Sequence, residues 1–378
     1  MSKHAPALLF LDQYGEIGGG QRILLNLVGA ARARGWTADV LCPLGPLADA
    51  ARASGATVHS LETLPMRNGP KSLWSLFRAG VLSRRLAKQH RSLAQECDLI
   101  VVNGPRTLAV ARAWVRELHK PALLYLHGFY GRVENMLIRS FLALPHTAAV
   151  APSSLVAAPF FRLRNIHTIN NWVSREFLDV PPNSGRLRQV LGITDTLPIV
   201  LVPGRFSPNK GQRLVLEASK LLSAIPCHFV FAGAPLFEEQ GREVAEELEA
   251  AAGRSPERIH VTYWKESMPS LYDGANIVVV PSVWKEPFGL TAIEAMARRR
   301  PLIVTDRGTL PVIADYGRAA RVTKADALEI SSALREYFKD PASWQARTTS
   351  ARKRVEDTYH PDSRQREILQ VFESLSAS

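Results

Sequence analysis

Short apolar segments of strand length alternate with longer helical segments along almost the whole chain of 378 residues. In the first half, the apolar segments predict strands at 7–11, 38–42, 57–61, 98–103, 122–127 and 147–151. The same pattern returns at 198–203, 227–232, 258–263, 277–281, 302–305 and 319–322. Apolar strands that alternate with helices are typical of parallel sheets covered on both faces. The chain is therefore expected to belong to the α/β class.

A polar segment separates the two sets of predicted strands. Residues 179–185, DVPPNSG, combine the proline, glycine and asparagine that are typical of a linker. The length of the chain also suits two domains of ordinary size. We therefore expect one Rossmann-like domain at 1–178 and a second one at 179–361.

The overall composition narrows the class of protein. Hydrophobic residues make up 46% and charged residues 22%, which is normal for a globular protein. No apolar run reaches the roughly 18 residues that suggest a membrane-spanning helix, and the N-terminus lacks the features of a secretory signal. The three cysteines lie far apart, and we expect them to be reduced. These features predict a cytoplasmic protein.

The net charge of +12 is concentrated in the first half of the chain. Residues 1–165 contain 20 basic and 9 acidic residues, whereas residues 166–378 contain 27 and 26. Such asymmetry indicates an anionic partner surface, either a membrane or a nucleic acid. No nucleic-acid-binding module is recognisable, so nucleic acid is not an expected partner.

Residues 282–297, SVWKEPFGLTAIEAMA, bring two carboxylates to a strand-to-helix turn. Glu286 is expected in the loop and Glu294 one turn into the helix. The first backbone amides of that helix come from Phe288, Gly289 and Leu290. Open α/β sheets bind ligands at this edge, and helix N-terminal amides hold phosphate groups. A phosphate between two hydroxyl-binding carboxylates suggests a sugar nucleotide, whereas the alternative is a capped helix with solvated glutamates.

A second motif, VPGRFSPNKG at 202–211, follows the first predicted strand of the second half. Gly204 turns the chain, and the cations Arg205 and Lys210 follow five residues apart. A diphosphate leaving group gains negative charge when its bond to the sugar breaks. Fixed cations at that point stabilise the developing charge. The alternative is a structural pair of basic residues.

Together, the two motifs resemble those of retaining glycosyltransferases, in particular glycosyltransferase family 4. The matching patterns are E-P-F-G-L-x-x-x-E-A-M-A, an E-x7-E motif, and G-R-x-x-P-x-K-G. The resemblance implies the GT-B fold, in which two Rossmann-like domains face each other across a cleft. It also implies that the last helix, 362–378, packs back on the first domain. In that family Glu286 would bind the hydroxyls of the donated sugar, and Glu294 those of the ribose.

In the first half, the glycines Gly18, Gly19 and Gly20 precede a predicted helix. Glycine allows close approach of the backbone to a ligand, and the resemblance implies that Gly19 and Gly20 contact the donor. An ordinary tight turn is the alternative. The family usually has a glutamate after these glycines, whereas this chain has Gln21.

Two further polar positions follow predicted strands of the first half, Asn103 and His127, and both are expected at the carboxyl edge of the sheet. Family members carry a histidine near the transferred sugar at the position of His127, although a structural histidine is the alternative. We expect Asn103, Tyr130 and Arg132 to contact the acceptor.

The basic segment 71–94 contains six Lys/Arg residues, no acidic residue and one apolar side. A basic amphipathic helix suits the surface of an anionic membrane. The alternative is a surface helix whose apolar side packs inside the first domain. Related enzymes often use lipid-linked acceptors, which favours peripheral association with the inner face of the cell membrane.

Two other departures from the family pattern lie in the second half. Trp264 replaces a common glycine, and it either stacks on the nucleotide base or packs in the core. The triplet Arg298, Arg299 and Arg300 stands where a glycine is usual. We expect the triplet to form a solvated helix end, where it favours the helix dipole.

These features predict a retaining glycosyltransferase that moves a hexose-type sugar from a nucleotide-diphosphate sugar to a glycan or lipid-linked acceptor. No Asp-x-Asp motif occurs, so we expect neither a metal nor another cofactor. One alternative is a GT-B-type sugar-nucleotide epimerase or hydrolase. The other is a non-catalytic basic protein that binds membranes or nucleic acid.

Overall fold

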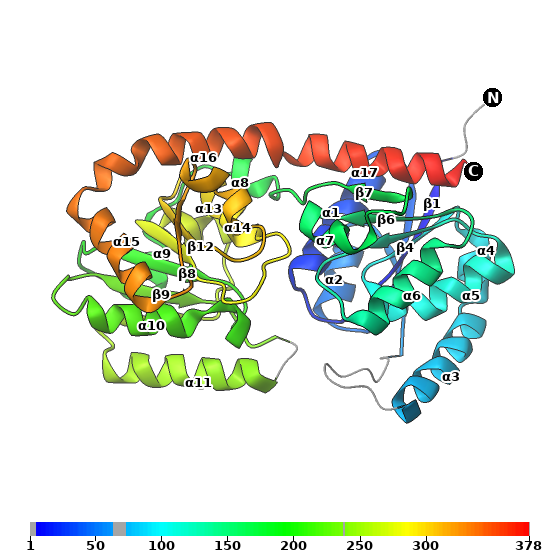
Figure 1. Ribbon diagram of the computed structural model, residues 1–378, viewed down its shortest axis with the longest axis horizontal. Coiled ribbons are helices and arrows are strands. Elements are labelled where there is room, and N and C mark those ends of the chain that lie inside the picture. The colour runs from blue at the N-terminus through cyan, green and yellow to red at the C-terminus, as the bar shows by residue number, and fades with distance from the viewer. Residues whose placement is uncertain (1–4, 63–72, 237–238, 378) are drawn as a thin grey trace. The chain divides into compact units, whose positions relative to one another are not determined.

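The computed structural model describes residues 5–62, 73–236 and 239–377, without the side chains of residues 73–77, 79 and 239. The chain divides into two compact units (Figure 1). Unit 1 comprises Met1–Asn170 and Asp362–Ser378, and unit 2 comprises Asn171–Pro361. Each unit is an α/β structure with its own hydrophobic core.

The described part of unit 1 contains a seven-stranded sheet in the order β3-β2-β1-β4-β5-β6-β7. All its paired strands are parallel. The strands are β1 Ala7–Leu11, β2 Thr37–Cys42, β3 Thr57–Ser60, β4 Leu99–Val102, β5 Ala122–Tyr125, β6 Thr147–Ala151 and β7 Ile166–Thr168. β7 was not predicted, because it is only three residues long and its residues are not fully buried.

The helices of unit 1 cover this sheet. They are α1 Gly19–Ala33, α2 Pro46–Ala53, α3 Leu73–Gln89, α4 Arg91–Glu96, η1 Pro105–Thr107, α5 Leu108–Leu118, α6 Arg132–Leu142, α7 Ser154–Ala157, η2 Ala158–Phe160 and α17 Pro361–Ser376. The last of these, α17, places Phe372 edge-on against Phe10 of β1, with 6.5 Å between ring centroids. An ion pair of 3.0 Å joins Glu373 of α17 to Arg34. The C-terminal helix is therefore part of the core of unit 1.

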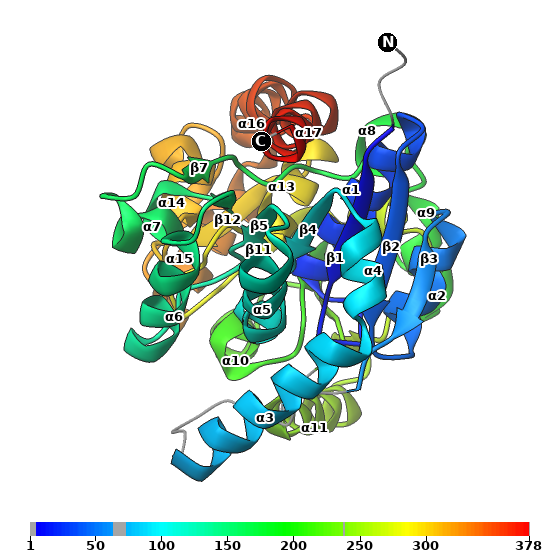
Figure 2. The ribbon, with the colours of Figure 1, turned by 90° about the vertical axis from the view of Figure 1, so that its right-hand side faces the viewer.

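The basic segment 71–94 falls on α3 and α4, which are separated at His90. The C-terminal half of α3 packs on α5 (Figure 2), where Leu86 is buried and the indole of Trp114 donates a hydrogen bond of 2.8 Å to Ala87 O. The solvent-facing residues of this half include Arg84, Arg85 and Lys88. The interpretation that the apolar side packs inside the first domain is therefore correct for this half of α3. Residues 71 and 72 and the side chains of 73–77 lie outside the described residues.

Unit 2 contains, within its described residues, a six-stranded parallel sheet in the order β10-β9-β8-β11-β12-β13. The strands are β8 Ile199–Pro203, β9 His228–Ala232, β10 Ile259–Thr262, β11 Ile277–Val280, β12 Leu302–Thr305 and β13 Arg321–Thr323. The helices are α8 Glu176–Asp179, α9 Gly185–Leu191, η3 Pro208–Lys210, α10 Gln212–Leu221, α11 Glu239–Arg254, α12 Met268–Asp273, α13 Leu290–Ala297, α14 Leu310–Ile313, η4 Asp315–Gly317, α15 Ala327–Lys339, η5 Pro341–Trp344 and α16 Gln345–Thr358. β8, β11 and β12 are buried throughout, as their apolar sequences predict.

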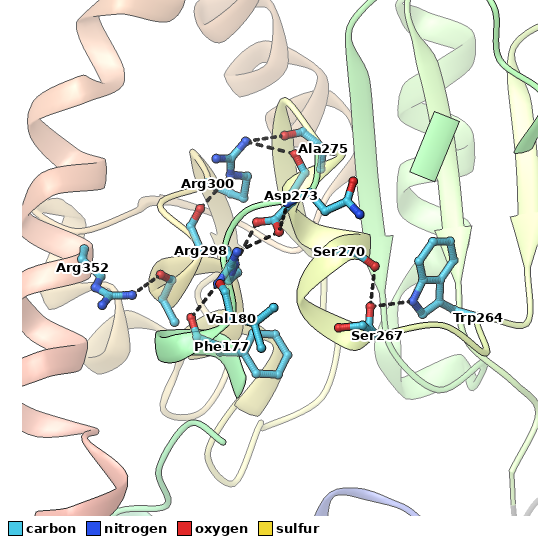
Figure 3. A network of polar contacts seen from close by, with 12 residues as sticks. Phe177, Val180, Trp264, Ser267, Ser270, Asp273, Ala275, Arg298, Arg300 and Arg352 are labelled. Carbon is cyan, nitrogen blue, oxygen red and sulfur yellow. Dashed lines mark hydrogen bonds and ion pairs between the residues drawn. The ribbon is translucent and has the colours of Figure 1, made fainter. Parts of the chain in front are cut away.

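A buried ion pair anchors the end of α13 (Figure 3). Nε and Nη2 of Arg298 each donate a hydrogen bond of 2.8 Å to the carboxylate of Asp273, the last residue of α12. Nη1 of Arg298 binds the carbonyl oxygens of Phe177 and Val180. Arg298 is 6% exposed, so the expectation that it is solvated is wrong. Its planar guanidinium satisfies acceptors of three residues in two segments and thereby fixes α13 against α12 and α8.

Candidate functional site

The site in unit 2 lies at the carboxyl edge of its sheet. β8, β11 and β12 are adjacent and parallel, so the loops that follow them meet at one edge. These loops span residues 204–211, 281–289 and 306–309. Both motifs singled out in the sequence, which lie about 80 residues apart, are therefore brought together within one unit.

Lys210 and Glu286 form the centre of this site. Nζ of Lys210 lies 2.9 Å from both carboxylate oxygens of Glu286, and the hydroxyl of Ser282 donates a hydrogen bond of 2.8 Å to Oε2. Burial alone would raise the pKa of Glu286. The positive charge and hydrogen bond of Lys210, with help from Ser282 and Arg205, hold that pKa below its usual range. Glu286 is therefore ionised and paired with Lys210. From the sequence, Glu286 was expected to bind the sugar and Lys210 the diphosphate, and no contact between them was predicted.

Two glycines permit the loops to approach one another closely. Gly211 has φ +70°, and a Cβ added there would lie 2.0 Å from Pro281 O. Gly308 has φ +61°, and its added Cβ would lie 2.2 Å from the backbone N and O of Glu286. A side chain at either position would displace the Glu286 loop.

The segment after β12 also holds the Glu286 loop, and sequence reasoning missed this segment. Thr309 N donates to Glu286 O at 3.0 Å, and its hydroxyl contacts Phe288 O at 2.6 Å. The available signal was Gly308, a glycine three residues after a buried strand, because glycine at such a position marks a turn.

Glu294 lies on α13, whose N-cap is Gly289 with φ +110° and no side-chain cap. The helix therefore begins without a side chain over its first amides, which include that of Leu290. Glu294 is 5% exposed, and its Oε2 accepts a hydrogen bond of 2.5 Å from the hydroxyl of Tyr272 on α12. The alternative of solvated glutamates is therefore wrong. Tyr272 was missed because no local pattern links residues 22 positions apart.

Trp264 does not project freely from this unit. Its ring packs against the hydrophobic core, and its indole N–H donates to Ser267 O at 3.1 Å, as Figure 3 shows. Of the two interpretations of Trp264, packing is therefore the one that agrees with its contacts in the structure.

Unit 1 has its own polar cluster at the carboxyl edge of its sheet, after the adjacent strands β1, β4 and β5. Nε2 of His127 lies 2.6 Å from Oδ1 of Asn103. A Cβ added to Gly20 would meet the His127 ring at 3.1 Å, and the amide of His127 donates to the Tyr130 hydroxyl at 2.9 Å. Gly20, Asn103, His127 and Tyr130 are thus neighbours, whereas Arg132 lies exposed at the first residue of α6.

Asp12 is the centre of this cluster, and sequence reasoning missed it. It follows β1 and is fully buried. Its Oδ2 accepts hydrogen bonds from Asn103 Nδ2 at 2.6 Å and Gln21 Nε2 at 2.9 Å, and its Oδ1 accepts from Tyr14 N at 2.8 Å. Burial raises the pKa of Asp12 to about 6, although these donors oppose the rise. An aspartate directly after an apolar strand was the signal.

Gln21 links the start of α1 to Asp12. Its Oε1 accepts a hydrogen bond of 3.1 Å from Gly18 N at the start of α1, while its Nε2 donates to Asp12. A glutamate at position 21 would place a second carboxylate against Asp12. The amide is therefore the residue that suits a buried, ionised Asp12.

The described residues contain neither a metal-binding cluster nor a membrane-spanning helix. No group of three His, Cys, Asp or Glu residues there is arranged to hold a metal ion. No described helix is both long enough and apolar enough to cross a bilayer. The three cysteines are buried and unpaired.

The sequence matches two protein families. Residues 17–189 match Glycosyltransferase Family 4, and residues 183–354 match Glycosyl transferases group 1. Among curated proteins, the lipopolysaccharide 1,2-N-acetylglucosaminetransferase of Salmonella typhimurium is 30% identical over 32% of this chain and 34% of its own length. The alpha-D-kanosaminyltransferase of Streptomyces kanamyceticus is 31% identical over 47% and 46%. The chain thus spans between about a third and a half of these relatives.

Solved structures resemble the fold over nearly the full chain. The Anabaena protein HepE in complex with UDP and glucose has a TM-score of 0.81 at 21% identity, and the match covers 98% of this chain and all of that one. Sucrose-phosphate synthase from Thermosynechococcus elongatus has a TM-score of 0.80 at 19% identity, covering 98% and 99%. The predicted fold class, α/β with two Rossmann-like domains of the GT-B type, is confirmed. The chain belongs to the glycosyltransferases, with an N-terminal part of the family 4 type and a C-terminal part of the group 1 type.

Proposed function

We propose that this protein transfers a hexose-type sugar from a nucleotide-diphosphate sugar to an acceptor hydroxyl, with retention at the anomeric carbon. The observation that carries the proposal is the cluster of Arg205, Lys210 and Glu286 beside the open N-terminus of α13. Cations and helix amides suit a diphosphate, and a carboxylate suits sugar hydroxyls. The relatives named above add support, since their names describe sugar transfer.

The ion pair gives the donor site a specific mode of action. A diphosphate would draw Lys210 toward itself, and the hydroxyls of the donated sugar would then occupy the oxygens of Glu286. As the anomeric C–O bond breaks, its electron pair leaves with the nucleoside diphosphate. Arg205, Lys210 and the amides of Phe288, Gly289 and Leu290 stabilise that charge. The acceptor oxygen forms the new bond, and its proton passes to the departing diphosphate.

Glu294 is proposed to bind the ribose of the nucleotide. The Tyr272 hydroxyl donates a hydrogen bond to its Oε2 and fixes the carboxylate. No metal is required in this proposal, because Arg205 and Lys210 provide the positive charge that a divalent ion supplies in other transferases.

On the acceptor side, the proposal assigns Asn103, Tyr130 and Arg132 to a glycan or lipid-linked acceptor. His127 is proposed to contact the transferred sugar, and Gly19 and Gly20 the donor. The support is the shared position of Gly20, Asn103, His127 and Tyr130 at one sheet edge, where open α/β sheets bind ligands.

A thermal-shift screen of UDP-, GDP- and ADP-sugars tests the donor assignment, since a bound donor raises the unfolding midpoint. The sugar nucleotide that gives the largest shift is then used in transfer assays with glycan and lipid-linked acceptors. Lys210→Ala should abolish most of the shift, with exposed Lys285→Ala as the matched control. An unchanged shift in Lys210→Ala would refute the site. Release of free nucleotide without an acceptor would favour the hydrolase alternative.

A membrane surface is a second proposed partner, carried by the exposed basic residues of α3 and by the charge excess of residues 1–165. Attraction is about 1 kcal/mol per basic residue near an anionic bilayer. Reversal of Arg84, Arg85 and Lys88 to glutamate should reduce pelleting with vesicles that contain phosphatidylserine. Reversal of the exposed residues Arg299, Lys324 and Lys339 of unit 2 is the control. Equal pelleting of both variants would exclude α3 as the contact.

A further inference from the structure

Asp12, Asn103 and His127 form a chain of hydrogen bonds across three adjacent strands of unit 1, here called the Asp12 relay. Asp12 follows β1, Asn103 follows β4, and His127 follows β5. Asn103 Nδ2 lies 2.6 Å from Asp12 Oδ2, and Asn103 Oδ1 lies 2.6 Å from His127 Nε2. The three residues are separated by 91 and 24 positions, so only the strand order joins them.

The direction of each hydrogen bond follows from the carboxylate. Ionised Asp12 only accepts, so the atom of Asn103 that faces it must be the amide nitrogen. That leaves Oδ1 of Asn103, which also only accepts, facing His127. Nε2 of His127 must then carry a proton, and in neutral imidazole Nδ1 is left as the acceptor.

Other contacts prevent this order from reversing. The Tyr14 amide and the Gln21 side chain both donate to Asp12, and Gln21 is held in that orientation by the amide of Gly18. Reversal of the relay would require Asp12 to donate, which an ionised carboxylate surrounded by donors cannot do.

The imidazole ring itself is held in place and kept neutral. It stacks on Tyr125 with 4.6 Å between centroids and an interplanar angle of 15°. Burial lowers the pKa of His127 to about 4. Within the described residues, Nδ1 makes no hydrogen bond and is not fully enclosed by protein atoms. Nδ1 is thus a fixed, accessible acceptor.

We propose that Asp12 is a positioning residue that holds His127, through Asn103, in the Nε2–H tautomer, so that Nδ1 accepts a hydrogen bond from a substrate hydroxyl. The proposal rests on the proposed glycosyl transfer and adds the direction of the contact. A lone pair at Nδ1 attracts a hydroxyl and repels a phosphate oxygen. His127 therefore selects a sugar or acceptor hydroxyl and not the diphosphate.

The decisive variant is the double substitution Asp12→Asn with Gln21→Glu, which exchanges the carboxylate and the amide within the same cluster. The new amide at position 12 then accepts from Tyr14 N and donates both of its protons, one to the new carboxylate at position 21 and one to Asn103 Oδ1. That carboxylate still accepts from Gly18 N. Asn103 must turn its nitrogen to His127 Nε2, and the proton moves to Nδ1. Net charge is unchanged and each of these groups keeps a partner.

The tautomer is read directly from the ¹⁵N chemical shifts of labelled histidine, with the His127 signal assigned by its loss in His127→Gln. We expect Nε2–H in the native protein and Nδ1–H in the double variant. Asp12→Asn alone, in which either amide orientation loses one bond, should lie between the two. In transfer assays kcat/KM of the double variant should fall by about tenfold or more, the effect of one substrate hydrogen bond.

Asp98→Asn is the matched control, because Asp98 accepts from Ala7 N at the opposite end of β1 and has no path to His127. The same tautomer in the native protein and in both Asp12 variants would overturn the relay. An inverted tautomer with unchanged kcat/KM would overturn the substrate contact. If no sugar nucleotide is transferred by the native protein, the proposed function fails, while the tautomer measurement still decides the relay.

Discussion

Each unit places a carboxylate at the carboxyl edge of its sheet, but the two carboxylates have opposite electrostatic surroundings. In unit 1, Asp12 is surrounded by neutral donors, and burial raises its pKa to about 6. In unit 2, Glu286 is equally central but faces the ammonium of Lys210, which holds its pKa below the usual range. Neutral donors around a carboxylate fix the direction of its hydrogen bonds. In an ion pair, by contrast, a charged ligand can replace one of the two partners. We therefore expect the hydrogen bonds of Asp12 in unit 1 to stay fixed when a ligand binds. In unit 2 we expect Lys210 and Glu286 to exchange each other for groups of the ligand.

The buried pair of Arg298 and Asp273 provides the reference for an ion pair that serves structure alone. Arg298→Met keeps the apolar stem but leaves Asp273 buried without its cation. Removal of one partner of a buried pair costs about 3–5 kcal/mol, so urea unfolding should show a loss of that size in unit 2. The exposed neighbour Arg299→Met should change stability by less than about 0.5 kcal/mol. Equal effects of the two would contradict a buried role for Arg298.

Lys210→Ala removes the cation of the pair that is proposed to bind the ligand, in contrast to the structural pair of Arg298 and Asp273. Turnover should fall by about 100-fold or more, because one fixed contact to a developing charge contributes roughly 3–4 kcal/mol. Steady-state kinetics with a saturating donor measure the effect. Lys285→Ala, next to Glu286 in sequence but exposed, should leave turnover within about twofold of the native rate. A similar loss in both variants would show that general surface charge, and not the pair, matters.

The pH dependence of stability tests the neutral cluster of unit 1. The folded pKa of Asp12 is raised, so its contribution to stability is largest at low pH and is lost as pH rises from about 4 to about 6. The pKa of His127 is lowered, so its contribution is present above pH 6.5 and is lost as pH falls toward 4. The two opposing slopes nearly cancel in the native protein.

Asp12→Asn removes one of these slopes and exposes the other. Between pH 6 and pH 4 the variant should lose about 2 kcal/mol more unfolding free energy than the native protein, since each pKa difference of one corresponds to about 1.4 kcal/mol and Asp12 is still half ionised at pH 6. Urea unfolding at pH values from 4 to 7 measures the two profiles. Asp98→Asn should follow the native curve. Parallel curves for Asp12→Asn and the native protein would mean that Asp12 does not titrate in this window.

Tyr272→Phe has the smallest expected effect. It removes the hydroxyl that binds Glu294 and nothing else of the ring, which packs edge-on against Phe177. Loss of one such hydrogen bond costs about 1 kcal/mol, and we expect it as a severalfold weaker affinity for the nucleotide with turnover nearly unchanged. Tyr263→Phe removes an exposed hydroxyl bonded to Glu249 and is the control. Isothermal titration with the nucleoside diphosphate would contradict the assignment if both variants bind alike.

Several features of the fold and site follow directly from local sequence. Apolar runs such as 277–281 and 302–305 predict buried parallel strands, and the structure has β11 and β12 there. The glycine and proline turns after these strands predict where loops meet. The roles of Arg205, Lys210, Glu286 and Glu294 in binding remain predictions, although the structure shows that Lys210 and Glu286 are neighbours.

Local sequence patterns could not predict which residues on different helices and strands contact one another. Arg298 looked like one of three solvated arginines, and only the position of α12 supplies Asp273 as its partner. Tyr272 and Glu294 lie 22 residues apart on two helices, so no periodicity connects them. β7 was missed because three partly exposed residues give no alternation to detect.

The sequence by itself determined that the chain forms two parallel α/β sheets with ligand-binding loops at their carboxyl edges, because burial along a strand or helix is written in local periodicity. Only the tertiary structure decided which polar groups meet there. The order β1-β4-β5 brings Asp12, Asn103 and His127 together, and the order β8-β11-β12 brings Lys210 to Glu286 and Gly308 beneath it. Hydrogen bonds form or fail over a few tenths of an ångström, and such distances depend on strand order and loop packing that no local segment encodes.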